Sequence, residues 1–193
     1  CALPISASLD ITPVNDDPTT TPVTLAAIAE DSGARVITQA ELVANSSDVD
    51  GGAPVATNLE IATGKGTLVD NGNGTWTYTP AQDDDTSVSF KYTIEDGHGG
   101  SVEGSASLDI TPVNDDPTTT PVTLAAIAED SGARVITQAE LVKNSSDVDG
   151  GAPVATGLSI DSGNDTLVDN HDGTWTYTPA LNDDTSVSFK YTI

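Results

Sequence analysis

The sequence predicts an all-β protein built from two tandem β-sandwiches, and three observations lead to this prediction. The chain repeats itself, its hydrophobic residues alternate with polar ones in short runs, and turn-forming residues separate those runs. Each repeat has the size of a complete small domain rather than of a solenoid unit. The expected architecture is therefore two sandwiches of about seven short strands each.

The repeat sets the expected domain organisation. Residues 6–94 align with residues 105–193 without a gap at a spacing of 99 residues, and eleven of the paired positions differ. We therefore expect a last strand of a preceding repeat, or a junction, at residues 1–14, a first repeat at residues 15–115, and a second, incomplete repeat at residues 116–193. The single cysteine, Cys1, has no partner in the chain, so disulfides cannot hold these domains together.

Period-two alternation of hydrophobic residues predicts the strands. It is clearest in residues 88–94 and 106–110. Along the first copy the same reasoning predicts seven strands, at residues 23–29, 34–38, 55–62, 67–70, 75–79, 88–94 and 102–111. The second copy reaches only the equivalent of residue 94, so we expect it to lack its last strand.

The fourth and fifth predicted strands are joined by a tight hairpin. Two Asn-Gly pairs at residues 71–74 tolerate the positive φ angles that such a turn requires. Trp76 and Tyr78 follow, alternating with threonine, and Trp175 and Tyr177 repeat them. This alternation favours a place in the core over an exposed aromatic platform for carbohydrate.

One short helical turn is expected between the second and third strands. Thr38 and Glu41 have the spacing of a capping box, in which the two side chains satisfy free backbone donors at the start of a helix. Thr137 and Glu140 repeat the pattern.

The charge of the chain excludes some partners and favours others. Its formal net charge is -24, from six basic and 30 acidic residues. Binding to nucleic acid or to an anionic membrane surface is therefore disfavoured, and cations are the natural partners. No stretch approaches the ~18–20 consecutive apolar residues that a membrane-spanning helix needs.

The acidic residues have the distribution of a calcium-binding protein. Most are aspartates, and they gather in loops with glycine, asparagine and serine. Ca²⁺ takes about six to eight oxygen ligands at about 2.3–2.6 Å, which short Asp side chains on tight turns can supply. Loops of an antiparallel chain alternate between the two ends of a sandwich, so we expect acidic loops of neighbouring copies to converge at each linker.

This reasoning assigns three groups of candidate Ca²⁺ ligands. The group expected between the two copies is Glu30, Asp31, Asp84, Asp85, Asn114, Asp115, Asp116, Asp147 and Asp149. An N-terminal half-site is expected at Asn15, Asp16, Asp17, Asp48, Asp50 and Asp96, and a C-terminal half-site at Glu129, Asp130, Asp183 and Asp184. A solvated acidic spacer is the simpler interpretation of the linker, and a plain turn is the simpler interpretation of Asp96. Asp83 is Asn182 in the second copy and is not expected to be an obligatory ligand.

Five segments carry a resemblance to a known family. They read AIAEDSG, ELVANSSDVDGG, GNGTWTYTP, SFKYTIEDGHGG and LDITPVNDDP, and together they span almost a whole copy. In this order they resemble the cadherin-like tandem repeats of bacterial RTX adhesins and related large surface proteins, a group that includes VCBS-type domains. The resemblance implies Greek-key sandwiches of the immunoglobulin or cadherin type.

The resemblance also implies a function and residue roles. It implies a Ca²⁺-rigidified extender that holds a ligand-binding tip away from the bacterial surface after type I secretion. Glu30 with Asp31, Asp84 with Asp85, residues 114–116, and Asp147 with Asp149 resemble the ligand motifs of that family. One departure is that these repeats often read NDSDVDG, whereas this chain has Ser46, and Ser145 in the second copy.

Other functions fit the sequence less well than the extender does. An enzyme is not expected, because no constellation of His, Lys or Cys accompanies the carboxylates, and neither His98 nor His171 belongs to a repeated site. A calcium-independent stalk is the main alternative. A further alternative is a fibre subunit, because residues 5–14 (ISASLDITPV) match the last strand that the second copy lacks. The expected partners are neighbouring repeats and, in that alternative, other copies of the chain.

Overall fold

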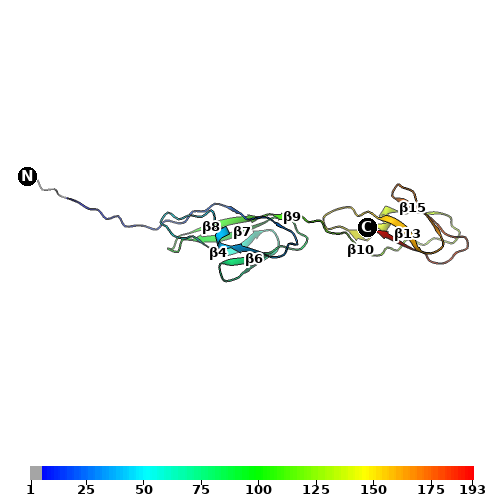
Figure 1. The fold of residues 1–193 in the computed structure, drawn as a ribbon, viewed down its shortest axis with the longest axis horizontal. Coiled ribbons are helices and arrows are strands. Elements are labelled where there is room, and N and C mark those ends of the chain that lie inside the picture. The colour runs from blue at the N-terminus through cyan, green and yellow to red at the C-terminus, as the bar shows by residue number, and fades with distance from the viewer. Residues whose placement is uncertain (1–5) are drawn as a thin grey trace, which may run out of the picture. The chain divides into compact units, whose positions relative to one another are not determined.

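The computed structural model describes residues 6–193 and shows two compact units, one ending at Val113 and one beginning at Asn114 (Figure 1). The regular secondary structure of each unit is almost entirely β-strand, which confirms the predicted fold class. The part of the N-terminal prediction that concerns residues 1–5 lies outside the described residues.

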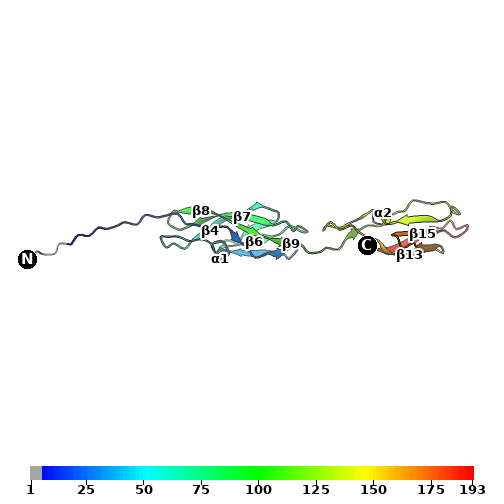
Figure 2. The ribbon, with the colours of Figure 1, turned by 90° about the horizontal axis from the view of Figure 1, so that it is seen from above.

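Residues 6–113, the described part of the first unit, contain nine short strands and one helical turn. In chain order these are β1 (Val23–Thr24), β2 (Ile28–Ala29), β3 (Arg35–Thr38), α1 (Gln39–Leu42), β4 (Val55–Thr63), β5 (Thr67–Asp70), β6 (Thr75–Thr79), β7 (Val88–Glu95), β8 (Ser101–Leu108) and β9 (Ile110–Thr111). One sheet has the order β1-β8-β7-β4, a second has the order β3-β6-β5, and β2 pairs with β9. Figure 2 shows the same unit from above.

The last strand organises the first unit. Strand β8 pairs with β7 along its whole length in antiparallel register, from Val88 opposite Leu108 to Glu95 opposite Ser101. On its other side β8 pairs with β1 in parallel, and β9 pairs with β2 in parallel. The predicted strand at residues 23–29 is therefore two short strands, because both pieces pair with a partner that is interrupted at Asp109. The Asp109 side chain at that break accepts a hydrogen bond from the Ser87 hydroxyl (2.7 Å).

The two sheets enclose the core of the first unit. Its buried hydrophobic residues are Val23, Leu25, Ile37, Leu42, Ala56, Leu59, Trp76, Tyr78, Val88, Phe90, Tyr92, Ile94, Ala106, Leu108 and Ile110. Trp76 and Tyr78 are thus core residues, as predicted, and not an exposed platform. The rings of Tyr78 and Phe90 meet edge to face with centroids 5.4 Å apart, a favourable aromatic geometry.

The helical turn α1 forms as the capping box predicts. The Thr38 hydroxyl accepts from the Glu41 backbone N–H, and the Glu41 carboxylate accepts from the Thr38 backbone N–H (2.8 Å). The Gln39 side chain adds a contact that the sequence did not reveal. Its amide accepts from the backbone N–H of Ala56 (2.8 Å) and donates to the carbonyl of Ala56 (2.5 Å), which ties α1 to β4.

The second unit repeats this arrangement without a last strand. Its elements are β10 (Thr118–Thr119), β11 (Arg134–Thr137), α2 (Gln138–Leu141), β12 (Ser145–Ser146), β13 (Thr156–Ser162), β14 (Thr166–Asp169), β15 (Thr174–Thr178) and β16 (Ser188–Thr192). The sheets are β11-β15-β14, β13-β16 and β10-β12. Residues 122–128, the counterparts of β1 and β2, form no strand, because β1 and β2 pair only with the last strand in the first unit.

The core of the second unit is correspondingly smaller. Its buried hydrophobic residues are Ile136, Leu141, Ala155, Leu158, Trp175 and Tyr177.

The hydroxyl of Tyr177 has a different environment from that of its counterpart Tyr78, whose hydroxyl donates to the Lys65 carbonyl (2.6 Å). Burial and a hydrogen bond with Asp165 raise the pKa of Tyr177 to about 12, and position 66 of the first copy is glycine instead of this aspartate.

Candidate metal-binding site

Acidic residues from three separate segments meet at one end of the first unit. We call this group the N-terminal acidic cluster, and it contains Asn15, Asp16, Asp17, Asp48, Asp50 and Asp96. Residues 15–17 precede the first strand, residues 48–50 lie between α1 and β4, and Asp96 lies between β7 and β8. The structure therefore brings together the six residues of the predicted N-terminal half-site.

A short backbone pairing positions the first two segments. Thr19 and Ser47 form an isolated antiparallel bridge, in which each backbone N–H donates to the carbonyl of the other (2.8 and 2.9 Å). Next to it, the hydroxyls of Thr20 and Ser46 are 2.9 Å apart and hydrogen-bonded. The chain entering the unit is thus held against the loop that carries Asp48 and Asp50.

The loop residues then bind the entering chain through their carboxylates. The Asp50 carboxylate accepts from the Asp16 backbone N–H (2.6 Å), and Asp48 Oδ1 accepts from the Asp50 backbone N–H (2.7 Å). The second oxygen of Asp48, Oδ2, is buried and accepts no hydrogen bond from the described residues. A buried carboxylate oxygen without a donor is costly, and a cation is the partner that would compensate it.

Asp96 is the most buried member of the cluster, with 2% of its surface exposed. Its carboxylate accepts from the Asn15 side-chain amide (2.7 Å) and from the backbone N–H groups of His98 (2.7 Å) and Gly100 (3.0 Å). The hydrogen bond from Asn15, followed by those from the backbone, holds the pKa of Asp96 below its usual range. Asp96 is therefore negatively charged at neutral pH.

Gly100 leaves room for the convergence of these side chains. A Cβ atom at this position would collide with Asp96 Oδ2 and would lie 2.9 Å from Asp17 Oδ1 and 3.1 Å from Asn15 Nδ2. The absence of a side chain at Gly100 therefore allows the carboxylates of Asp17 and Asp96 to lie close to each other.

The cluster is negative and lacks a basic counter-ion among the described residues. Five of its six members are aspartates. The Lys–carboxylate and Arg–carboxylate pairs of the described chain join Arg35 to Glu41, Lys65 to Asp84, Lys91 to Glu60, Arg134 to Glu140, and Lys190 to Asp161. The oxygen-only donor set and the unbalanced charge fit a hard divalent cation such as Ca²⁺.

The second unit repeats the contacts between the first two segments of this cluster at its own N-terminal end. The Asp149 carboxylate accepts from the Asp115 backbone N–H (2.7 Å), and Asp147 Oδ1 accepts from the Asp149 backbone N–H (2.9 Å). The Asn114 amide donates to the Asp115 carbonyl (3.0 Å), as the Asn15 amide donates to the Asp16 carbonyl in the first unit. Asp116 is exposed.

The opposite end of the first unit carries the other predicted acids. Glu30 is buried, with 4% of its surface exposed, and its carboxylate accepts from the Val113 backbone N–H (2.6 Å). The Asp31 carboxylate accepts from the Asp83 backbone N–H (3.3 Å), and Asp85 is exposed. These contacts fix Glu30 and Asp31 within the first unit.

Asp84 forms an ion pair with a lysine. The Lys65 ammonium lies 3.0 Å from Asp84 Oδ2, and Asp84 Oδ1 accepts from the Thr86 backbone N–H (3.1 Å). Hydrogen bonds from Thr86 and Lys65 hold the pKa of Asp84 below its usual range. A cation at Asp84 would have to displace Lys65, a competition that the sequence did not reveal.

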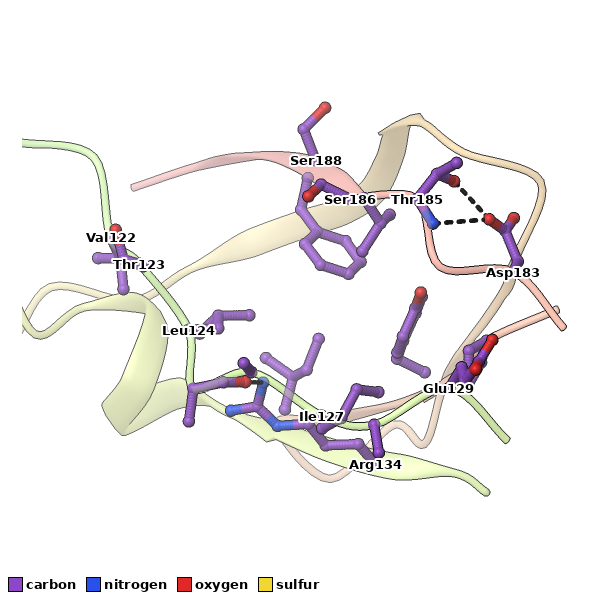
Figure 3. Close-up of a pocket in the computed structure, with 18 of the residues that line it drawn as sticks. Val122, Thr123, Leu124, Ile127, Glu129, Arg134, Asp183, Thr185, Ser186 and Ser188 are labelled. Carbon is purple, nitrogen blue, oxygen red and sulfur yellow. Dashed lines mark hydrogen bonds between the residues drawn. The ribbon is translucent and has the colours of Figure 1, made fainter. Parts of the chain in front are cut away.

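The second unit differs from the first at this end. Position 164 is Asn where the first copy has Lys65, so Asp183 has no equivalent lysine. Asp183 keeps the hydrogen bond from the Thr185 backbone N–H (2.9 Å; Figure 3), the counterpart of that from Thr86, and Asp130 accepts from the Asn182 backbone N–H (3.0 Å). Glu129 and Asp184 are exposed.

Sequence reasoning missed the residues that position the cluster. Thr20, Ser46 and Gly100 have no feature of their own that marks them as neighbours of aspartates. The only signal in the sequence is that a run of three threonines, residues 19–21 and 118–120, recurs in both copies together with a pair of serines. In the structure the threonines of the second copy pair with its two serines.

The fold and the acidic ends define a tandem β-sandwich protein of the cadherin type. The sequence profile of the cadherin-like domain matches residues 14–111 and 113–193, and the chain therefore belongs to the cadherin-like domain family. No curated protein sequence matches the chain significantly. None of the described helices has the length and hydrophobicity needed to cross a membrane.

Several solved structures are similar to large parts of this chain. The extracellular domain of protocadherin gamma B4 matches over 91% of this chain and 30% of its own, with 12% identity and a TM-score of 0.43. Extracellular cadherin domains 3–6 of protocadherin gamma B2 match over 86% and 39%, with 12% identity and a TM-score of 0.42. The endo-fucoidan hydrolase MfFcnA4 matches over 91% and 28%, with 17% identity and a TM-score of 0.37. This chain thus spans less than half of each of these proteins, and the likeness gives no evidence of function.

Proposed function

We propose that this chain is a Ca²⁺-rigidified extender of a bacterial cell-surface adhesin, with a structural rather than a catalytic role. Tandem cadherin-like domains fit an extracellular spacer or adhesion protein. The observation that carries the calcium part of the proposal is the buried Asp48 Oδ2, which has no donor among the described residues and lies in a cluster of five aspartates. The bacterial adhesin setting, with export by type I secretion, rests on the five sequence segments that resemble those repeats.

The ligands in this proposal come from each end of a unit. The N-terminal acidic cluster would supply Asn15, Asp16, Asp17, Asp48, Asp50 and Asp96. Between the two units the proposed ligands are Glu30, Asp31, Asp84, Asp85, Asn114, Asp115, Asp116, Asp147 and Asp149, and the last group is Glu129, Asp130, Asp183 and Asp184. The convergence of acidic loops at each linker, which the alternation of loops in an antiparallel chain predicts, supports this assignment.

Bound Ca²⁺ would make the joint between units stiff. Without a cation, clustered carboxylates repel one another, and this repulsion favours a mobile joint. A bound Ca²⁺ would replace repulsion with coordination. A ligand that binds only the folded state also stabilises it, by about 2.7 kcal/mol at roughly a hundredfold excess over Kd.

Calorimetric titration of the chain with Ca²⁺ tests this proposal. We expect saturable binding to the wild type, and Asp48→Asn should weaken binding at the N-terminal cluster by about tenfold or more because a carboxylate ligand is lost. Glu103→Gln is the matched control, since it removes one charge from an exposed position on β8 and should leave binding unchanged. Wild-type heats equal to those in EDTA would instead identify a calcium-independent stalk.

Small-angle scattering and thermal unfolding test the mechanical part. Ca²⁺ should increase the maximum dimension and the melting temperature of the wild type, and EDTA should reverse both changes. Asp149→Asn should reduce the change in dimension, because this residue belongs to the proposed site between the units. Binding of Ca²⁺ without any change in dimension would refute rigidification while leaving the metal site intact.

A further inference from the structure

The turn between β5 and β6 carries two Asn-Gly pairs, Asn71-Gly72 and Asn73-Gly74. Both asparagines are exposed, and the two glycines have positive φ angles of 70° and 77°. An asparagine that precedes glycine loses its side-chain amide without an enzyme, because a residue without a side chain lets its backbone nitrogen approach the asparagine Cγ. The two pairs are equivalent in sequence, and their contacts in the fold distinguish them.

Hydrogen bonds hold the Asn71 side chain against β6. Its Nδ2 donates to the hydroxyls of Thr75 (2.9 Å) and Thr77 (3.1 Å), and its Oδ1 accepts from the Thr77 hydroxyl (3.2 Å). The nitrogen that would attack Asn71 is the backbone N–H of Gly72, which donates to Asp70 Oδ1 (2.8 Å). Both groups that would have to react at Asn71 are thus held by other residues, and freeing them costs hydrogen bonds.

The contacts of Asn73 favour the same reaction. Its Oδ1 accepts from the backbone N–H (3.2 Å) and the hydroxyl (2.7 Å) of Thr75. Neither its Nδ2 nor the Gly74 N–H makes a hydrogen bond to any described residue. Attack on Cγ places negative charge on Oδ1, and the two donors of Thr75 stabilise that charge as an oxyanion hole does. The attacking and the leaving nitrogen, in contrast, are not held.

We propose that Asn73 is a site of spontaneous deamidation and that the fold protects Asn71 from the same reaction. The Gly74 nitrogen forms a bond to Asn73 Cγ, the bond from Cγ to Nδ2 breaks, and Nδ2 leaves as ammonia with the Gly74 proton. Water then opens the cyclic imide at one of its two carbonyls, which gives aspartate or isoaspartate at position 73. The reaction needs only water and does not depend on Ca²⁺.

The second unit shows that an aspartate fits this turn. Asp172 is the counterpart of Asn73, and its Oδ1 accepts from the backbone N–H (3.0 Å) and the hydroxyl (2.6 Å) of Thr174. The hydrogen bond from the Thr174 hydroxyl, together with that from its backbone, holds the pKa of Asp172 below its usual range. Deamidation of Asn73 to aspartate therefore adds one negative charge to the first unit and preserves the contacts of the turn.

The second unit also repeats the protected position. Asn170 is the counterpart of Asn71, and its side chain donates to the Thr174 hydroxyl (2.9 Å) and accepts from the Thr176 hydroxyl (3.1 Å). His171 follows it in place of glycine, and its backbone N–H donates to Asp169 Oδ1 (2.8 Å). Asn170 should therefore be as stable as Asn71.

Peptide mapping by mass spectrometry tests the proposal on the 193-residue chain in EDTA. The folded wild type is incubated in warm, mildly alkaline buffer, and fragment spectra locate the mass gain that accompanies the exchange of an amide for a carboxylate. We expect this gain at Asn73 at least about tenfold faster than at Asn71, because Asn71 must first break its hydrogen bonds. In guanidinium chloride these bonds are lost, and the two positions should react at similar rates.

Asp172→Asn is the matched variant, because it writes Asn-Gly-Thr into the second turn, where Thr174 donates the same two hydrogen bonds. It should create a second labile position, while Asn170 in the same chain stays intact. Asn73→Asp should gain no mass at position 73 and should unfold at the same temperature as the wild type, because the turn accepts a carboxylate.

Three results would overturn the proposal. One is an equal rate at Asn71 and Asn73 in the folded chain. Another is a folded Asn73 that stays intact for the time in which the unfolded chain reacts completely. The third is an Asp172→Asn chain in which position 172 is as stable as Asn170. Because EDTA is present throughout, none of these results bears on the calcium proposal.

Discussion

The hydroxyl of Ser46 lies 2.9 Å from that of Thr20, and this contact gives a physical reason for a departure from the family pattern. The adhesin repeats that the sequence resembles often carry aspartate at this position. In this chain the serine ties the loop to the entering strand, and Ser145 does the same with Thr119 in the second unit (2.8 Å). The position therefore contributes to holding the cluster together rather than to its charge.

Position 83 is explained in a similar way. Asp83 and its counterpart Asn182 both have positive φ angles, of 51° and 53°. Asn and Asp tolerate this left-handed conformation better than other residues with side chains. Each uses its backbone N–H to bind the preceding acidic loop, at Asp31 or Asp130. The prediction that Asp83 is not an obligatory ligand stays a prediction, and this geometry agrees with it.

At the residue scale we predict that Asp96→Asn destabilises the first unit at neutral pH and not in acid. Hydrogen bonds hold the pKa of Asp96 below its usual range in the folded state. Its charged form therefore stabilises the fold above the unfolded pKa of about 4, and this contribution is lost as the pH falls through the lower folded pKa. Urea unfolding of the wild type and of the variant, in EDTA at neutral and at acidic pH, measures the difference in their free energy of unfolding. A difference that is constant with pH would contradict the prediction.

At the scale of elements, the Gln39 side chain joins α1 to β4 through both backbone groups of Ala56, a residue with 1% of its surface exposed. Gln138 makes the same pair of bonds to Ala155 in the second unit. Because Ala56 and Ala155 are buried, water cannot easily replace these bonds.

We therefore predict that Gln39→Ala lowers the free energy of unfolding of the first unit by about 1–3 kcal/mol, since two buried backbone groups lose their partners. Chemical denaturation followed by tryptophan fluorescence measures the change. Gln82→Ala is the control, because Gln82 is exposed and belongs to a loop. A similar loss in both variants would show that the Ala56 contact is unimportant.

At the scale of the molecule, two nearly identical sequences have cores of different size. The buried hydrophobic residues of the first unit include Ala106, Leu108 and Ile110 from the last strand, together with the residues that this strand covers. The second unit lacks both contributions. Burial of apolar surface provides most of the stability of such small domains.

We predict two unfolding transitions in EDTA, with the second unit melting at the lower temperature. Differential scanning calorimetry of the chain in EDTA measures both transitions. Gln138→Ala should lower only the melting temperature of the second unit, which unfolds first on heating. Gln39→Ala should lower only the melting temperature of the first unit. A single cooperative transition that both variants shift equally would contradict this prediction.

The sequence by itself determined the β-sandwich class, the helical turns and the place of the aromatic residues in the core. These features depend on local periodicity, on the spacing of Thr38 and Glu41, and on the alternation around Trp76 and Tyr78. All of these signals involve residues that are close together in the sequence. The repeat also predicted that the second unit lacks its last strand, because the two copies could be compared position by position.

Only the tertiary structure decided how the acidic residues are used. The pairing of Thr19 with Ser47, the space beside Gly100 and the ion pair of Lys65 with Asp84 join residues that are far apart in the chain. Whether a carboxylate oxygen is left without a donor, as Asp48 Oδ2 is, likewise depends on contacts between distant segments. Local sequence determines which backbone conformations are favourable, whereas burial and charge pairing depend on distant segments that meet only in the folded chain.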